Sequence, residues 1–73
     1  MPIIEMHLLE GRTAEQKRRV AAAITEAVAR SLECRADTVR ILITEHGAEE
    51  FYVAGQNRVQ AAELARLEQE KTP

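Results

Sequence analysis

The sequence predicts an α/β fold built on one β-α-β unit, and three observations lead to this prediction. Residues 3 to 9 form a short apolar run, residues 14 to 33 are rich in helix-forming side chains, and residues 38 to 45 alternate β-branched and polar positions. A strand, a long helix and a second strand make a unit with parallel strands and a right-handed crossover. We therefore expect residues 1–73 to form a single domain, in which residues 58–73 are a helical tail.

The first strand, residues 3 to 9, ends where Gly11 allows backbone angles that other residues avoid. One face of the strand carries Ile4, Met6 and Leu8, and the other carries Ile3, Glu5, His7 and Leu9. This pattern predicts that one face is covered and the other is partly covered. We expect the two histidines of the chain, His7 and His46, to be surface or packing residues.

The helix is expected to run from Ala14 to about Glu33. Thr13 can cap it, and Gln16 completes a capping box three residues later. The predicted buried stripe consists of Val20, Ile24, Ala27, Val28, Ser31 and Leu32. Residues 34 to 37 then form a connection to the second strand.

The second strand is expected over residues 38 to 45. Its apolar positions are Val39, Ile41 and Ile43, and Arg40 lies in the middle of the strand on the opposite face. Beyond it, the sequence predicts a loop with a short extended piece over residues 51–54. A helix follows from Arg58, with Asn57 as its cap and apolar positions at Val59, Ala62, Leu64 and Leu67. We expect residues 68 to 73 to fray.

The length and composition of the chain point to self-association. A chain of 73 residues makes one small, marginally stable domain, and Cys34 is its only cysteine, so no intrachain disulfide can staple it. A two-stranded sheet also leaves two open edges. The net charge of -2 gives no general attraction to nucleic acid, and the run from Lys17 to Arg19 is expected to be a solvated helix face. No membrane span is apparent, and a cytoplasmic location is expected.

Three stretches of this sequence resemble one known family. The segments "MPIIEMHLLEGRTAEQK" and "TVRILITEH", followed by a phenylalanine after a short loop, resemble the 4-oxalocrotonate tautomerase family over roughly residues 2 to 55. The resemblance implies a β-α-β chain that assembles into a hexamer, with a dimer as the second choice. It also implies a general base at an amino-terminal proline that removal of the initiator methionine exposes.

The resemblance assigns four site residues in this chain. Pro2 corresponds to the catalytic proline, and Arg12 to an arginine that binds a substrate carboxylate. Arg40 corresponds to a second arginine that polarises the 2-oxo or enol oxygen and holds the other carboxylate. Phe51 corresponds to the hydrophobic wall of the pocket. In the family these groups come from different subunits. The segment "FYVAGQ" departs from the glycine-rich stretch that is common in the family at this place.

The chemistry of the expected reaction explains these residue types. Moving a double bond in a 2-hydroxydienoate requires one group near neutral pKa that removes a proton from oxygen and returns one to carbon. A free α-amine titrates near this range, and burial beside two cations lowers its pKa. Planar guanidinium groups bind a dianionic substrate and stabilise charge on the enolate oxygen. Nothing in this scheme requires a metal ion or a cofactor. The expected substrate is a small carboxylate such as 2-hydroxymuconate.

Other interpretations of the sequence compete with this one. Pro2 alone fits the tolerated first residue of a strand, and Phe51 alone fits a core residue. A hydratase or dehalogenase of unsaturated acids, as in some relatives, would need a carboxylate just beyond the aromatic residue, where this chain has Val53. A non-catalytic oligomeric binding protein, or a subunit of a hetero-oligomer, would be favoured if Met1 were retained.

Overall fold

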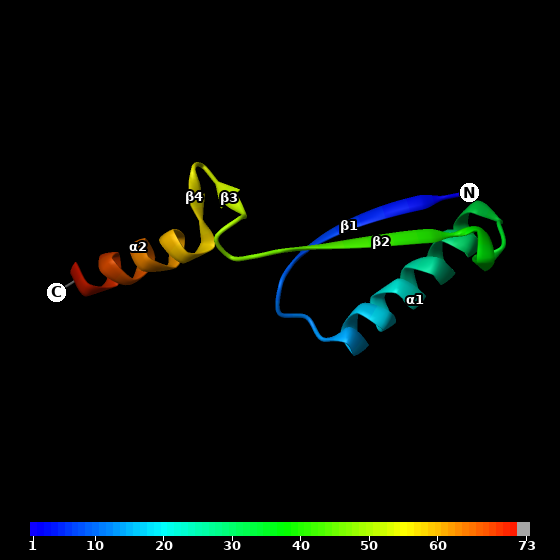
Figure 1. Ribbon diagram of the computed structural model, residues 1–73, viewed down its shortest axis with the longest axis horizontal. Helices are drawn as coiled ribbons and strands as arrows, with labels where there is room; N and C mark the ends of the chain where they lie inside the picture. Colours follow the sequence, from blue (N-terminus) through cyan, green and yellow to red (C-terminus); the bar gives the residue numbers. More distant parts are fainter. Residues whose placement is uncertain (72–73) are drawn as a thin grey trace.

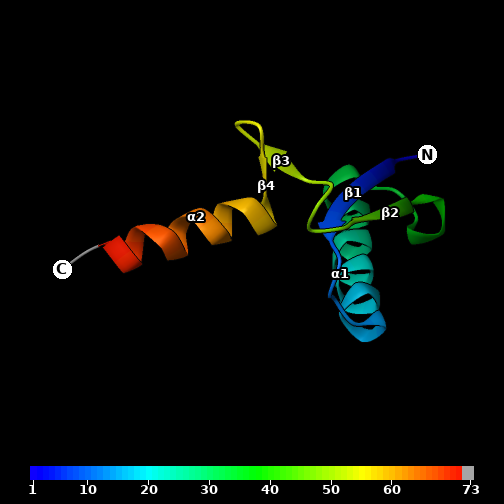
Figure 2. The same cartoon turned by 60° about the vertical axis from the view of Figure 1, so that its left-hand side comes forward.

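The computed structural model describes residues 1–71 and confirms the predicted β-α-β unit (Figure 1). In chain order its elements are β1 (Ile3–Leu9), α1 (Ala14–Leu32), the 3-10 helix η1 (Ala36–Thr38), β2 (Arg40–His46), β3 (Tyr52–Val53), β4 (Gln56–Asn57) and α2 (Arg58–Lys71). The strands β1 and β2 pair in parallel, with Ile3 opposite Arg40 and Leu9 opposite His46. Helix α1 lies against one face of this pair, and the opposite face has no layer over it (Figures 1 and 2).

Helix α1 begins and ends as its local sequence dictates. The Thr13 hydroxyl accepts a hydrogen bond from the Gln16 amide at 3.1 Å, and the Gln16 side chain accepts one from the Thr13 amide at 3.0 Å. This capping box satisfies two of the free donors at the start of the helix. Glu33 takes up a left-handed conformation with a φ of 54°, which ends the helix one residue earlier than expected.

The predicted buried stripe on α1 was partly wrong. Val20, Ile24 and Val28 are half-buried against the sheet, as expected. The other predicted positions, Ala27, Ser31 and Leu32, are exposed. Small residues beside the first three take their place, namely Ala21, Thr25 and Ala29. The face of α1 that contacts the sheet is therefore rotated relative to the predicted face, and it includes smaller side chains.

The start of β2 also differs from the prediction, because a turn of 3-10 helix occupies residues 36 to 38. The Thr38 hydroxyl donates to the Arg35 carbonyl at 2.6 Å, and Arg35 forms an ion pair with Asp37 at 3.0 Å. These local bonds hold Thr38 in the turn. Strand β2 consequently covers Arg40–His46 rather than residues 38 to 45, and Arg40 is its first residue rather than a residue in its middle.

The extended piece predicted over residues 51–54 is half of a small hairpin. Strands β3 and β4 pair antiparallel through a two-residue turn at Ala54 and Gly55, both with positive φ, at 53° and 81°. This is the geometry of a tight hairpin, in which alanine is an unusual first residue. The prediction missed β4 because its residues, Gln56 and Asn57, have little preference for strands.

The helical tail predicted over residues 58–73 is α2, and it extends to Lys71 without the fraying expected from residue 68. Residues 72–73 lie outside the described part of the chain. Asn57 caps the helix as predicted, since its side-chain oxygen accepts from the Gln60 amide at 2.8 Å. The Gln60 side chain accepts from the Asn57 amide at 3.0 Å, so this start is a reciprocal cap like that of α1.

A single copy of the chain has almost no interior. None of the apolar residues among 1–71 is buried, and the accessible surface is 6024 Å². A compact monomer of this mass exposes about 4,500 Å². The radius of gyration is 18.0 Å, where a compact chain of this length has about 11 Å. The hairpin and α2 extend away from the β-α-β unit in both views (Figures 1 and 2). Folding in this shape requires other chains to cover the exposed apolar surface.

We predict that the protein is an oligomer at micromolar concentration, because its core is completed only between copies. Light scattering coupled to size exclusion measures the mass directly. The expected result is a multiple of the chain mass of 8.2 kDa that persists on dilution through the micromolar range. A folded species with the mass of one chain would contradict this prediction.

Candidate active site

Pro2 is the residue immediately before β1. Its carbonyl accepts a hydrogen bond from the Arg40 amide at 2.9 Å, so the parallel pairing holds Pro2 beside the start of β2. Met1 is 78% exposed and is accessible to removal. With Met1 attached, the Pro2 nitrogen is an amide and has no basicity. Without Met1 it becomes a secondary amine on a strand that is anchored at that end of the sheet.

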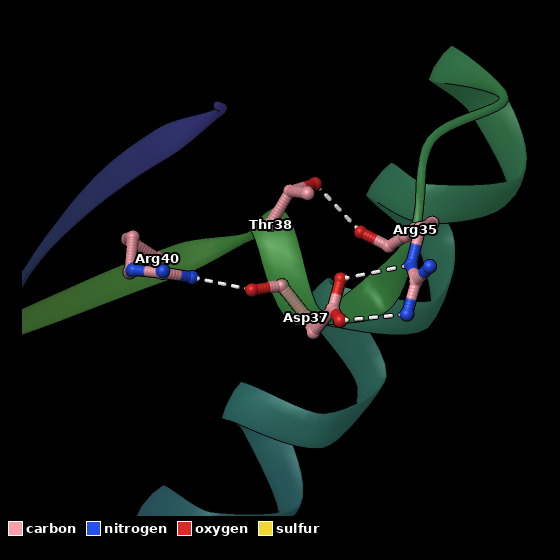
Figure 3. A network of polar contacts seen from close by, with 4 residues as sticks. All are labelled: Arg35, Asp37, Thr38 and Arg40. Atoms are coloured by element: carbon pink, nitrogen blue, oxygen red, sulfur yellow. Dashed lines mark hydrogen bonds and ion pairs between the residues drawn. The ribbon is translucent and has the colours of Figure 1, made fainter.

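Arg40 is anchored at the same end of the sheet, but its side chain lies on the other face from α1. Ile41 and Ile43 are half-buried, whereas Arg40 is exposed, as the alternation of a strand requires. Its guanidinium group donates to the Asp37 carbonyl at 2.6 Å (Figure 3). The Arg35–Asp37 ion pair and the Thr38 hydrogen bond fix the turn that presents this carbonyl. The guanidinium group is thus oriented, with further donors available for a ligand.

Arg12 lies at the opposite end of the sheet, beyond β1. It borders a hollow of about 270 Å³ between β1 and α1, lined by Met6, Leu8, Val20, Gln16 and Lys17 as well. Within residues 1–71, Arg12 makes no hydrogen bond and no ion pair. A cation without a partner beside an apolar floor is suited to a carboxylate that carries a hydrocarbon chain.

Lys17 was predicted to be a solvated residue, and this prediction was wrong. Its side chain is only 26% exposed and reaches Glu45 on β2 as an ion pair. The sequence contains a signal for this position, because Lys17 lies one helical turn before Val20 and Ala21 on the same face of α1. The pairing neutralises Lys17 and leaves Arg12 as the uncompensated cation of the hollow.

Phe51 follows the loop that leaves β2, and the residue is 45% exposed. The two residues after it, Tyr52 and Val53 of β3, are 58% and 65% exposed. Phe51 therefore belongs to an apolar surface on the hairpin, and it is not part of a core within its own chain. It lies at the same end of the sheet as Arg12, because His46 at the end of β2 is paired with Leu9 at the end of β1.

One copy of the chain does not bring the four predicted residues together. Pro2 and Arg40 are at the amino-terminal end of the parallel strands, and Arg12 and Phe51 follow their carboxyl-terminal ends. At the rise of a parallel strand, the two ends are about 23 Å apart. This is too far for any pair of side chains to act on one small molecule. The elements position each residue, and a site that contained all four of them would need more than one copy of the chain.

Two classes of feature are absent from the described part of the chain. No three side chains of the His, Cys, Asp and Glu types in residues 1–71 are placed to hold a metal ion together. Neither helix in this range has the length and apolar character needed to cross a membrane.

Comparison with known proteins gives consistent matches over most of the chain. A family model described as "Tautomerase enzyme" matches residues 2–60. A 2-hydroxymuconate tautomerase from Pseudomonas putida is 41% identical over 56 residues, which are 77% of this chain and 89% of that protein. The region matched by the family model contains all four predicted site residues.

Solved structures share the fold as well as the sequence. One from the 4-oxalocrotonate tautomerase isozymes of Methylibium petroleiphilum is 60% identical with a TM-score of 0.81, covering 86% of this chain and 98% of that one. A heterohexamer 4-oxalocrotonate tautomerase from Chloroflexus aurantiacus is 30% identical with a TM-score of 0.78, covering 82% of this chain and 97% of that one. The arrangement of β1, α1, β2 and the hairpin is therefore a shared architecture.

Proposed function

This chain belongs to the tautomerase family, and from that premise we propose that it isomerises small 2-hydroxy- or 2-oxo-carboxylates such as 2-hydroxymuconate. We propose Pro2 as the base and acid, Arg12 and Arg40 as the groups that bind and polarise the substrate, and Phe51 as the apolar wall. The observation that supports this most is the position of Pro2. It directly follows an exposed Met1, and its carbonyl accepts a hydrogen bond from the amide of Arg40.

The proposed proton transfer uses one group twice. The neutral Pro2 amine removes the proton from the 2-hydroxyl oxygen of the dienol, and the double bonds shift as the 2-oxo group forms. The protonated amine then delivers its proton to a carbon of the conjugated chain, which returns Pro2 to the neutral state. No atom is gained or lost, so the step is an isomerisation, and it needs only a base whose pKa lies near the working pH.

The two arginines support different parts of this reaction. Arg40 is the candidate for stabilising negative charge on the oxygen that loses its proton, because its guanidinium group is already oriented by Asp37. Arg12 is the candidate for holding a carboxylate remote from the reacting atoms, because it is unpaired beside an apolar hollow. Phe51 would exclude water from the hydrocarbon part of the substrate.

A two-fold arrangement of copies would bring Arg12 and Phe51 to Pro2. If two copies pair their free sheet edges about a two-fold axis, the edge strands run antiparallel. The amino-terminal end of one sheet then lies beside the carboxyl-terminal end of the other. Pro2 of one copy is thereby brought near Arg12 and Phe51 of the second copy, across the distance that separates them within one chain.

The uncovered face of the sheet supports a larger assembly than this pair. It carries Ile3, Leu42 and Arg40, and the first two of these residues are 61% and 51% exposed. Stacking of edge-paired dimers would bury these apolar groups and would also bring Arg40 close to other copies. We therefore propose a hexamer of one kind of chain, with the dimer as its building block and as the second choice.

We predict that Arg40→Ala and Arg12→Ala change different kinetic constants. Loss of Arg40 should lower kcat by roughly 10²-fold, the effect of removing one donor to a developing oxyanion. Loss of Arg12 should mainly raise KM, because its contact with the remote carboxylate is the same in the ground and transition states. Steady-state kinetics with 2-hydroxymuconate distinguishes these effects.

Arg18→Ala is the matched control for both variants, because Arg18 is an exposed arginine on α1 and the substitution removes the same charge. It should behave as the parent enzyme. Small and equal effects of all three substitutions, with the assembly intact, would show that neither Arg12 nor Arg40 contacts the substrate.

We predict that an uncleavable extension before Pro2 abolishes the isomerisation. Such an extension keeps the Pro2 nitrogen an amide, so the loss should reach at least the ~10²–10⁴-fold contributed by a general base. The processed protein is the comparison, with intact mass showing that Met1 is gone. Circular dichroism and light scattering should show the same fold and assembly in both. An extended protein that isomerises 2-hydroxymuconate at the parent rate would refute the role of Pro2.

A further inference from the structure

The two histidines of the chain meet on the uncovered face of the sheet. His7 is in the middle of β1, and His46 is the last residue of β2. His7 is paired with Thr44, so His46 lies diagonally across from it, two residues further along β2. The Nδ1 atom of His7 is 2.8 Å from the Nε2 atom of His46. Sequence spacing could not reveal this pair, because 39 positions separate its members.

The geometry of the pair is that of a direct hydrogen bond. The ring centres are 5.1 Å apart and the ring planes are inclined by only 24°. The distance between the ring centres is close to the sum of the two ring radii and the 2.8 Å between the nitrogen atoms. Both nitrogen atoms therefore lie near the line that joins the ring centres, and they face each other directly. The lone pair of one ring therefore points at the N–H of the other, and the two do not converge on a shared third point.

This geometry limits the number of protons that the pair can hold. One nitrogen in the gap must donate and the other must accept, so the contact persists when both rings are neutral or when one ring is protonated. When both rings are protonated, two N–H donors and two positive charges face each other across the gap. The paired conformation therefore cannot hold a proton on both of the facing nitrogen atoms.

Other charged groups surround the pair but do not remove this conflict. Glu5 lies on the same face of β1, and the carboxylates of Glu10 and Glu50 approach Gly47 next to His46. These acids attract protons to the rings without supplying a lone pair inside the gap. Arg40 is on the same face at the far end of β2. On the other face, Lys17 and Glu45 neutralise each other.

The pair lies where the two substrate-facing segments leave the sheet. The His46 carbonyl accepts a hydrogen bond from the Glu10 amide at 2.8 Å, and this is the last backbone hydrogen bond between the two segments. Just beyond it, one segment continues to Arg12 and the other, through Gly47, to Phe51. A change in the pair therefore acts at the common origin of both segments.

We propose that the His7–His46 pair is a proton-sensitive clasp that holds the carboxyl-terminal end of the sheet closed at neutral pH and opens in mild acid. Opening loosens the last pairing of β1 with β2 and releases the segments that carry Arg12 and Phe51. Histidine side chains generally change charge between about pH 5 and pH 8, so the two conditions to compare are pH 7.5 and pH 5.0.

The sign of the pH effect follows from counting protons. In acid the unfolded chain binds two protons at these rings, while the closed pair binds at most one. Stability rises with pH wherever the unfolded state binds more protons, so the clasp stabilises the folded chain at high pH and this contribution is lost as the pH falls. A difference of one proton changes the folding equilibrium constant by up to about tenfold per pH unit.

Urea unfolding at fixed protein concentration, at pH 7.5 and at pH 5.0, tests the clasp in the parent enzyme and in His46→Gln. The glutamine amide can still hydrogen-bond to His7 but cannot become charged, so two cations never meet. Between the two pH values, the parent should lose roughly tenfold more in its folding constant than this variant. All other titrating groups are common to both proteins and cancel in the comparison.

His46→Leu provides the second arm, because it removes the hydrogen bond at every pH. It should be less stable than the parent at pH 7.5 and should show the same shallow pH dependence as His46→Gln. His7→Gln tests the same bond from the other strand and should reproduce the His46→Gln result. A parent enzyme that loses no more stability in acid than His46→Gln and His7→Gln do would overturn the proposal.

Discussion

The parallel pairing of β1 with β2 is the constraint on which the rest of this structure depends. It anchors Pro2 to Arg40 through a backbone hydrogen bond of 2.9 Å and fixes both at one end of the sheet. The same pairing places Arg12 and Phe51 beyond the other end. A parallel pair also needs a crossover helix, and α1 supplies it while covering one face only. The free edges, the uncovered face and the separation of the four proposed site residues all follow from this one arrangement.

Association of copies would complete the core and would also bring the separated, proposed site residues together. The chain exposes 6024 Å² and buries no apolar side chain among residues 1–71, so association supplies the burial that other domains obtain from their own chain. The contacts that cover the edges and the bare face are also those that would bring Arg12, the proposed carboxylate-binding residue, to Pro2 of another copy. In this account stability and catalysis depend on the same interfaces, and a clasp at the end of the sheet, such as His7–His46, would influence both.

Much of the fold could be predicted from the sequence, because strong local signals agree with it. The capping box at Thr13 and the alternation around Ile41 each mark an element. Predictions failed where the local structure depends on a side-chain hydrogen bond, or where the burial of a residue depends on a partner far away in the sequence. The turn before Arg40 depends on side-chain bonds of Arg35 and Thr38. The half-burial of Lys17 depends on an ion pair to a strand 28 residues away. The site residues could be named by resemblance, but their separation within one chain emerged only from the strand register.

The central claim, that each site is assembled from more than one copy, is tested most directly by mixing two impaired variants. Arg12→Ala and Arg40→Ala are unfolded together in equal amounts and refolded. The mixture is assayed against each variant refolded alone, with 2-hydroxymuconate far below the KM of Arg12→Ala, where both variants are slow. If the two arginines of a site come from different copies, random assortment leaves roughly one site in four intact, and activity should recover toward a quarter of the parent value. A mixture that is no more active than the average of its two components would contradict the account.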